Sequence, residues 1–171
     1  GNVDGGNYLG GLVGKNSSEL SSIYYSYSTG SVDGGGRLGG LCGLNEGSVI
    51  ACSALGEIKG SYDNGGLVGV NLGSVVNSCS NGSVSGDQDI GGFVGSNSGS
   101  ISFSCSTGDV EGFDKVGGFA GSSSFGRIAN SCCSGQVNGQ YKTAGLVGRL
   151  YGSNVSNCFW DIENSGQNIG C

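Results

Sequence analysis

The stretch Asp89–Gly112, DIGGFVGSNSGSISFSCSTGDVEG, contains the pattern on which most of the chain is built. Two glycines precede two apolar residues and a third glycine. Ser-Gly-Ser-Ile follows after two polar residues, and the unit ends in Ser-Thr-Gly-Asp-Val-Glu-Gly. Five more copies of this pattern occur in the 171 residues. Self-similarity at a fixed period of this size is typical of repeat architectures, in which each unit packs only against its neighbours.

The second glycine of each pair fixes the period. It lies at Gly11, Gly40, Gly66, Gly92, Gly118 and Gly145, so the steps are 29, 26, 26, 26 and 27 residues. We expect the extra residues in loops at Ser17–Ser22 and Gly34–Arg37. The prediction is one repeat domain over residues 1–171, with repeats near 9–34, 38–60, 64–86, 90–112, 116–139 and 143–160, and with 161–171 as a C-terminal tail or cap.

Each unit carries three short apolar segments separated by Gly and Ser. Short β-branched segments with alternating polar neighbours favour strands, and no stretch has the period and length of a helix. The first segment places Leu12, Leu41, Leu67, Phe93, Phe119 and Leu146 in one column. The second begins at Ile23, Val49, Val75, Ile101, Ile128 and Val155. The third carries Val32, Ile58, Val84, Val110 and Val137.

A single unit cannot bury its own apolar side chains, but coils stacked about 4.8 Å apart form a continuous core. Three strands in a coil of about 26 residues predict an all-β, roughly triangular parallel β-solenoid of six rungs. Right-handed coiling is the default for parallel crossovers. We expect the three apolar columns to be its structural core.

A column of amides lies shortly after the first segment. It consists of Asn16, Asn45, Asn71 and Asn97, with Ser123 and Leu150 in the last two copies. Stacked amides can hydrogen-bond along the solenoid axis, whereas a simple turn preference for Asn is the alternative. Neither interpretation implies chemistry.

The eight cysteines are candidates for disulfides: Cys42, Cys52, Cys79, Cys105, Cys132, Cys133, Cys158 and Cys171. Three of them, Cys79, Cys105 and Cys132, follow their second segment at the same distance and should stack on adjacent rungs. The sequence cannot choose among the 105 pairings that eight thiols allow. We expect at least one disulfide, and buried free thiols are the alternative.

Composition narrows the function classes. The net charge is −6, with seven basic residues. This charge argues against binding to nucleic acid or to an anionic membrane, and we also expect no insertion in a membrane. The chain lacks His and C-x-x-C pairs, so we expect no metal, no cofactor and no Ser-His-Asp triad. The acids recur along one edge, as Asp4, Asp33, Asp63, Asp87, Asp89, Glu111 and Asp114. Such recurrence indicates a repeated loop rather than a unique catalytic site, so we expect no enzyme.

The repeats resemble those of a known family. GLVG occurs at Gly11–Gly14, Gly66–Gly69 and Gly145–Gly148, followed by Gly-Ser and an apolar residue and then by S-x-G-x-V-x-G, and this arrangement resembles the GLUG-motif repeat. The closing CFWDIENSG of Cys158–Gly166 is similar to the ends of such arrays. The resemblance implies a repeat region of large bacterial or archaeal surface and secreted proteins, including adhesin-like ones, without an activity of its own.

These observations predict a non-catalytic extracellular or cell-surface structural module. Gly1–Gly5 resembles a third segment, and Val155–Phe159 resembles a second segment. Val3 of one subunit would therefore complete the last coil of another subunit. This contact would give a stalk or a head-to-tail filament. Neighbouring repeats of a longer chain are the other expected partner. A cap formed by Trp160 and Asp161–Cys171 is the alternative to head-to-tail stacking. Carbohydrate or host binding as an adhesin is a second functional hypothesis, and a polysaccharide-active β-helix enzyme fragment is a third.

Overall fold

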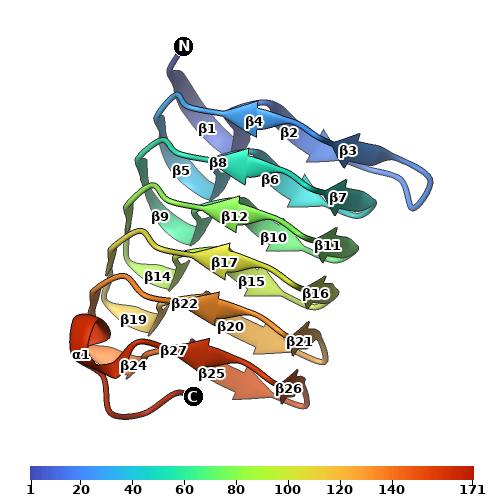
Figure 1. The fold of residues 1–171 in the computed structure, drawn as a ribbon. Helices are drawn as coiled ribbons and strands as arrows, with labels where there is room; N and C mark the ends of the chain where they lie inside the picture. Colours follow the sequence, from blue (N-terminus) through green and yellow to red (C-terminus); the bar gives the residue numbers. More distant parts are fainter.

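Residues 1–171 of the computed structural model form six stacked coils followed by a short helix and a C-terminal tail (Figure 1). Strands from successive coils pair in parallel and in register, as Val68 does with Val94 and Val75 with Ile101. The prediction of an all-β parallel β-solenoid with a period of about 26 residues is confirmed. No helix is long and apolar enough to cross a membrane.

Each coil contributes to four sheets, which we label A to D in the order that the chain visits them. Sheet A contains β1 (Val3–Gly10), β5 (Val32–Gly39), β9 (Ile58–Gly65), β13 (Val84–Ser85), β14 (Gln88–Gly91), β18 (Val110–Glu111), β19 (Asp114–Gly117), β23 (Val137–Asn138) and β24 (Tyr141–Ala144). Sheet B contains β2 (Val13–Asn16), β6 (Cys42–Asn45), β10 (Val68–Asn71), β15 (Val94–Asn97), β20 (Ala120–Ser124) and β25 (Val147–Tyr151).

The two remaining sheets follow on the other side of the coil. Sheet C contains β3 (Ser22–Tyr24), β7 (Ser48–Ile50), β11 (Ser74–Val76), β16 (Ser100–Ser102), β21 (Arg127–Ala129) and β26 (Asn154–Ser156). Sheet D contains β4 (Tyr27–Ser28), β8 (Ser53–Ala54), β12 (Cys79–Ser80), β17 (Cys105–Ser106), β22 (Cys132–Cys133) and β27 (Phe159–Trp160). The chain then forms α1 (Ile162–Ser165).

The prediction of three strands in each coil is wrong, because the second apolar segment is divided between sheets C and D. Two residues separate the two strands in every coil, and the first of them has a left-handed backbone; φ is 52° at Asn77 and 53° at Phe103. A left-handed residue breaks the extended run and changes the direction of the chain. The glycine pair likewise marks the corner between sheets A and B, where Gly91 ends β14 and Val94 begins β15.

The core consists of two separate clusters rather than one. The larger cluster joins the first and second apolar columns between sheet B and sheets C and D. The smaller cluster contains the third column and lies within sheet A, whose strand turns back on itself in each coil. Gly112 lies at such a turn, and a Cβ there would lie 2.8 Å from Cγ2 of Val116. A side chain at this position would therefore clash with the smaller cluster.

The burial of the predicted core residues depends on the coil that carries them. Fifteen of the seventeen are buried: Leu41, Leu67, Phe93, Phe119, Leu146, Ile23, Val49, Val75, Ile101, Ile128, Val32, Ile58, Val84, Val110 and Val137. Val155, in the last coil, is partly buried against the larger cluster. Leu12 is a correction, since its side chain is 51% exposed. It lies in the first coil, so only Leu41 of the second coil stacks on it and its other side faces solvent.

The C-terminal tail closes the corner between sheets A and B in the last coil. Asp161 caps α1 by accepting a hydrogen bond from the Asn164 backbone, and Gly166 ends the helix with φ of 66°. The sequence pattern predicts no helix, and this single turn is too short to produce a helical periodicity. Beyond it, the Gly170 carbonyl accepts hydrogen bonds from the Leu146 and Val147 amides at 3.0 and 2.8 Å. This segment is therefore a cap for that corner.

The two phenylalanines at the centre of the larger cluster provide a test of the register. Phe93 and Phe119 are fully buried, and their rings stack with centroids 4.7 Å apart. Replacing Phe93 by Ala removes this contact and leaves a cavity, so we expect the free energy of unfolding to fall by roughly 3–5 kcal/mol in guanidinium denaturation. Phe103→Ala, at a side chain 59% exposed one corner away, is the control and should cost much less. Equal effects would contradict the proposed packing.

Candidate functional site

The predicted amide column is a continuous hydrogen-bonded ladder inside the solenoid. Asn16 donates from Nδ2 to Oδ1 of Asn45 at 2.8 Å, Asn45 donates to Asn71 at 2.9 Å, and Asn71 donates to Asn97 at 2.9 Å. Asn97 continues the ladder to the hydroxyl of Ser123 at 3.3 Å. All four amides are buried. Leu150 takes the column's position in the last coil and is 39% exposed, but the Ser123 hydroxyl donates to the Ser153 hydroxyl of that coil at 3.1 Å, so side-chain hydrogen bonds reach all six coils.

The ladder makes a prediction about stability. Asn71→Ala removes the donor that Oδ1 of Asn97 accepts from, and a buried acceptor without a partner costs roughly 1–3 kcal/mol. We expect the free energy of unfolding in urea to fall by about that amount. Asn81→Ala is the matched control, because Asn81 makes an exposed bond to Thr107 at 2.8 Å and its loss should change stability by no more than about 0.5 kcal/mol. A turn preference alone predicts no difference between the two variants.

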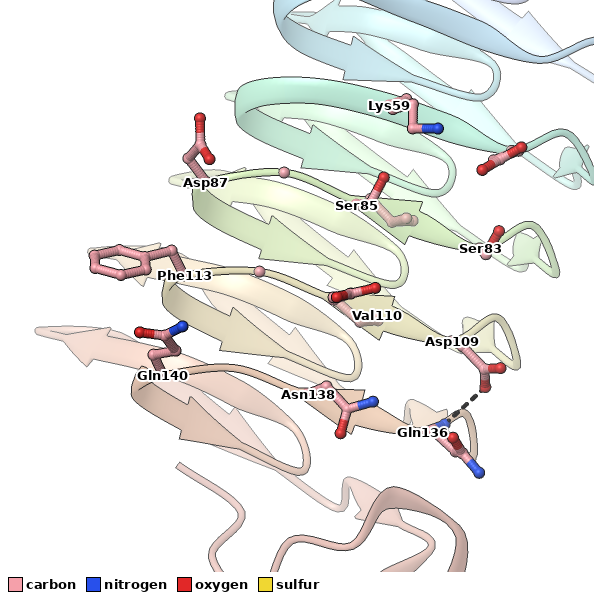
Figure 2. Close-up of a pocket in the computed structure, with 15 residues that line it drawn as sticks. Lys59, Ser83, Ser85, Asp87, Asp109, Val110, Phe113, Gln136, Asn138 and Gln140 are labelled. Atoms are coloured by element: carbon pink, nitrogen blue, oxygen red, sulfur yellow. Dashed lines mark hydrogen bonds between the residues drawn. The ribbon is translucent and has the colours of Figure 1, made fainter.

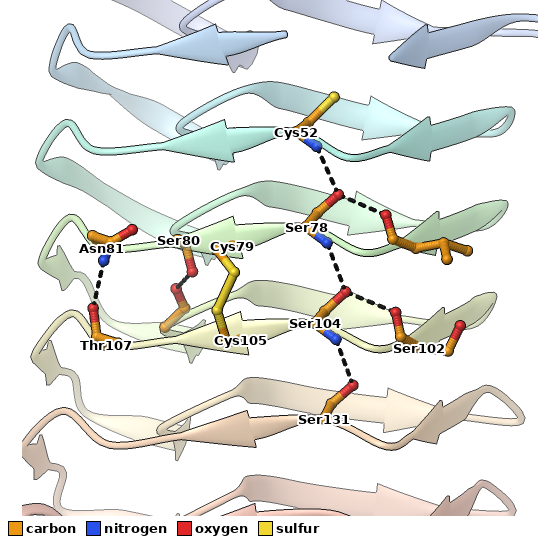
Figure 3. Close-up of a disulfide and its surroundings, with 12 residues drawn as sticks. Cys52, Ser78, Cys79, Ser80, Asn81, Ser102, Ser104, Cys105, Thr107 and Ser131 are labelled. Carbon is orange, nitrogen blue, oxygen red and sulfur yellow. Dashed lines mark hydrogen bonds between the residues drawn. A yellow bond between two sulfur atoms is a disulfide. The ribbon is translucent and has the colours of Figure 1, made fainter. Parts of the chain in front are cut away.

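A second ladder is made of serines and was not predicted from the sequence. The Ser78 hydroxyl accepts from the Cys52 amide at 3.1 Å, Ser104 accepts from the Ser78 amide at 3.3 Å, and Ser131 accepts from the Ser104 amide at 3.3 Å (Figure 3). These bonds lie at the corner between sheets C and D, where the left-handed residue turns the backbone amide away from the usual strand partner. The repeated Ser-Cys of NSC and FSC is the sequence signal that indicates this position.

The cysteines fall into two groups. Cys79 and Cys105 form a disulfide between adjacent coils, with their Cα atoms 4.7 Å apart. The other six are free thiols: Cys42, Cys52, Cys132, Cys133, Cys158 and Cys171. Burial raises the pKa of Cys42 to about 11 and that of Cys133 to about 12. Buried thiols of this kind stay protonated and act as small core residues.

A column of charged side chains runs along sheet A where it approaches sheet B. Its positions are Tyr8, Arg37, Asp63, Asp89, Lys115 and Lys142, all with left-handed φ between 46° and 59°. Asp89 and Lys115 form a buried ion pair, with Oδ2 and Nζ 2.9 Å apart. Arg37 lies 3.6 Å from Asp63 and hydrogen-bonds to the Tyr8 hydroxyl. Glycines of sheet B allow this approach, since a Cβ at Gly121 would lie 2.3 Å from the Asp89 carbonyl carbon.

The pKa of Asp63 is raised above its ordinary value of 3.8, mainly by burial and then by the negative charge of Asp89, while Arg37 opposes the shift. The folded protein therefore holds this proton more tightly than the unfolded chain does. Ionised Asp63 then destabilises the fold progressively as the pH rises from the unfolded value through the folded one.

This shift predicts a pH-dependent effect of Asp63→Asn. The amide resembles the protonated carboxyl, so the variant and the wild type should be similar in stability near pH 3. The variant should gain stability relative to the wild type toward pH 7, because it lacks the buried charge. Thermal unfolding across this range measures the difference. Asp4→Asn, at an exposed carboxyl of the first coil, controls for the loss of one charge. A difference in stability between the variant and the wild type that does not change with pH would contradict the raised pKa of Asp63.

The largest hollow on the surface is a polar groove of about 670 Å³ on the first half of the sheet A strands (Figure 2). It extends over several coils and is lined mainly by acids, amides and hydroxyls: Glu57, Lys59, Ser83, Ser85, Asp87, Asp109, Glu111, Gln136, Asn138 and Gln140. Phe113 lines it as well, 49% exposed, with its ring edge-to-face against Tyr141 at 5.1 Å. Hydroxyl-rich ligands would find both donors and acceptors here, together with one apolar face.

The recurring acids do not form a single ridge. Asp4 and Asp33 lie in register with Lys59, on the same column as Glu111 in the groove. Asp87 lines the groove as well, whereas Asp63 and Asp89 belong to the charged column. Asp114 instead pairs with Lys142 at 3.3 Å. Asp87 and Asp89 are only two residues apart, and the left-handed backbone of Asp89 breaks the alternation that would otherwise keep both side chains on one face.

The acids and cysteines do not come together as a metal centre. No group of three or more His, Cys, Asp or Glu side chains is placed to hold a metal ion. The largest acidic grouping is the groove, where the carboxylates lie among amides, hydroxyls and Lys59.

The fold and its ladders define a parallel β-solenoid repeat module, in which each coil bonds to the next through the same positions. Residues 5–33 match the family model of the GLUG motif. The later copies of the pattern are similar in sequence to this matched segment. No curated protein and no solved structure gives a significant match to the chain.

Proposed function

We propose that this chain is a non-catalytic structural module that works outside the cell or at its surface, as a stalk or spacer. The observation that supports this most is the continuity of its axial bonding. The phenylalanine stack, the asparagine ladder and the Cys79–Cys105 disulfide all join one coil to the next. Six coils at strand spacing give a stiff body on the order of 30 Å long. A structural disulfide fits an oxidising compartment.

The ends of the solenoid support a specific mode of self-association. Throughout the stack, an amide at the corner of sheets A and B donates to the carbonyl of the coil below, as Phe119 does to Leu146 at 3.0 Å. In the last coil, Leu146 donates to Gly170 of the tail instead, also at 3.0 Å. At the opposite end, Leu12 is half-exposed and no coil of residues 1–171 lies above its carbonyl.

Gly170 thus takes the place that the corner leucine of a further coil would occupy. We infer that Leu12 of a second copy competes with the tail for the Leu146 and Val147 amides. Head-to-tail stacking then requires the tail to move away, and the contact is heterologous, so it propagates into a filament. In this mode the tail limits assembly of the module.

Deleting Gly166–Cys171 tests this mode of assembly. The truncated chain should form unbranched filaments in electron micrographs at concentrations at which the full chain remains a single particle. Adding Leu12→Asp to the truncation should abolish the filaments, because the charge blocks the other end of the same contact. Amorphous aggregates that persist with Leu12→Asp, or no assembly of the truncated chain, would contradict it.

Carbohydrate binding in the groove is the second candidate, and the half-exposed Phe113 among amides and carboxylates is the observation that favours it. Sugars present hydroxyls to such polar groups and their C–H faces to aromatic rings. The carboxylates favour neutral or amino sugars over acidic ones. Titration of oligosaccharides should give binding that Phe113→Ala weakens by about tenfold or more, while Phe125→Ala, at an exposed ring outside the groove, leaves it unchanged. Binding insensitive to Phe113 would exclude this groove.

Catalysis is tested separately. A panel of polysaccharides should show no hydrolysis or elimination with the purified chain. Cleavage that Asp87→Ala abolishes would overturn the non-catalytic assignment. Asp87 is the appropriate position because it lines the groove, whereas Asp89 is ion-paired with Lys115 and its removal would affect folding.

A further inference from the structure

Three cysteines occupy consecutive outward positions of sheet D. Cys79 pairs with Cys105 in register, and Cys105 pairs with Cys132 in the next coil. The disulfide joins the first two, and Cys132 is an exposed free thiol beside them. Cys105 therefore has a cysteine directly above it and another directly below it, but it can bond to only one at a time.

The two steps of this column are structurally equivalent. The Cys105 amide donates to the Ser78 carbonyl at 3.0 Å, and the Cys132 amide donates to the Ser104 carbonyl at 3.1 Å. The serine ladder repeats the same bond beside each step, at 3.3 Å from Ser78 to Ser104 and at 3.3 Å from Ser104 to Ser131 (Figure 3). A Cys105–Cys132 bond therefore needs no backbone arrangement that the Cys79–Cys105 bond lacks.

We propose that Cys79, Cys105 and Cys132 form one thiol–disulfide exchange site in which the unpaired thiol moves between the two ends of the column. The Cys132 thiolate attacks Sγ of Cys105, a bond forms between these two sulfurs, and the Cys79–Cys105 bond breaks. Cys79 leaves as a thiolate and takes up a proton, so the step consumes no oxidant or reductant. In-register pairing places Cys132 on the side of Cys105 opposite to Cys79, which is the side from which a thiolate must approach to displace Cys79.

The surrounding thiols cannot replace Cys132 in this step. Cys133 is adjacent in sequence but points into the core, where its thiol donates to the Gly145 carbonyl at 3.0 Å and its pKa is raised to about 12. Burial also raises the pKa of Cys158, in the following coil. The column is thus the modifiable site, and a small external disulfide would react with whichever end carries the thiol.

Peptide mapping distinguishes the two bonds directly. Tryptic cleavage after Lys59, Lys115, Arg127 and Lys142 places Cys79 and Cys105 in one peptide, residues 60–115, and Cys132 in another, residues 128–142. The chain, purified without reductant, is held at pH 8, acidified, alkylated and then digested. We expect both the internal disulfide of 60–115 and its cross-link to 128–142, in amounts within about tenfold of each other. Detection of the internal disulfide alone would overturn the proposal.

Serine variants assign the bonds. Serine fits this column, because Ser53 already occupies the equivalent position in the second coil, next to Cys79. Cys79→Ser should yield only the cross-link, Cys132→Ser only the internal disulfide, and Cys133→Ser, the matched control, both. Cys105→Ser should yield neither, because Cys79 and Cys132 are then two strand spacings apart, about 9–10 Å, beyond the reach of a disulfide. A cross-link that survives Cys132→Ser would place the exchange elsewhere and overturn the assignment. The wild-type ratio decides the question if a variant does not fold.

Discussion

Parallel pairing of each coil with the next, in register, is the constraint on which the rest of this structure depends. It requires residues one period apart to occupy equivalent positions, so each side chain meets a near-copy of itself. Side chains that bond well to their own kind are favoured under this constraint. Phe93 on Phe119, Asn71 on Asn97 and Cys79 on Cys105 satisfy it by stacking, by an amide hydrogen bond and by a covalent bond. Axial stability therefore comes from the repetition itself.

Charged side chains cannot stack on their own kind in this way, because like charges on successive coils repel each other. The charged column instead alternates, at least in part: Arg37 precedes Asp63, and Lys115 follows Asp89. Like charges follow each other at two steps, from Asp63 to Asp89 and from Lys115 to Lys142. The raised pKa of Asp63 reflects burial first and then the negative charge of Asp89. Residue type differs from coil to coil at this column and in the groove. Both surfaces therefore distinguish one coil from the next.

The sequence was sufficient for the fold class, the period, the amide ladder and the stacking of Cys79, Cys105 and Cys132, because all of these follow from residue type at a fixed spacing. It was insufficient for the corners. A left-handed residue such as Asn77 or Phe103 has no distinctive side chain, so the division of one apolar segment into two strands leaves little trace. The exposure of Leu12 was also missed, because a column pattern does not show which of its members lies at the edge. The groove depends on the turn within sheet A and was not predictable from loop composition.

The last coil shows how departures from the repeat end an otherwise unlimited stack. Any coil edge fits any other, so a cap must satisfy the same amides while offering no new edge. The tail satisfies these amides with the Gly170 carbonyl, which takes the place of the carbonyl of a corner leucine. Trp160 replaces the missing core side chain: a Cβ at Gly145 or at Gly170 would lie 2.1 or 2.6 Å from its ring. The indole also donates to the Gln167 carbonyl at 3.1 Å, which fixes the returning chain. The only tryptophan in the sequence thus lies where the repetition stops, and glycine on both sides of it makes the closure sterically possible.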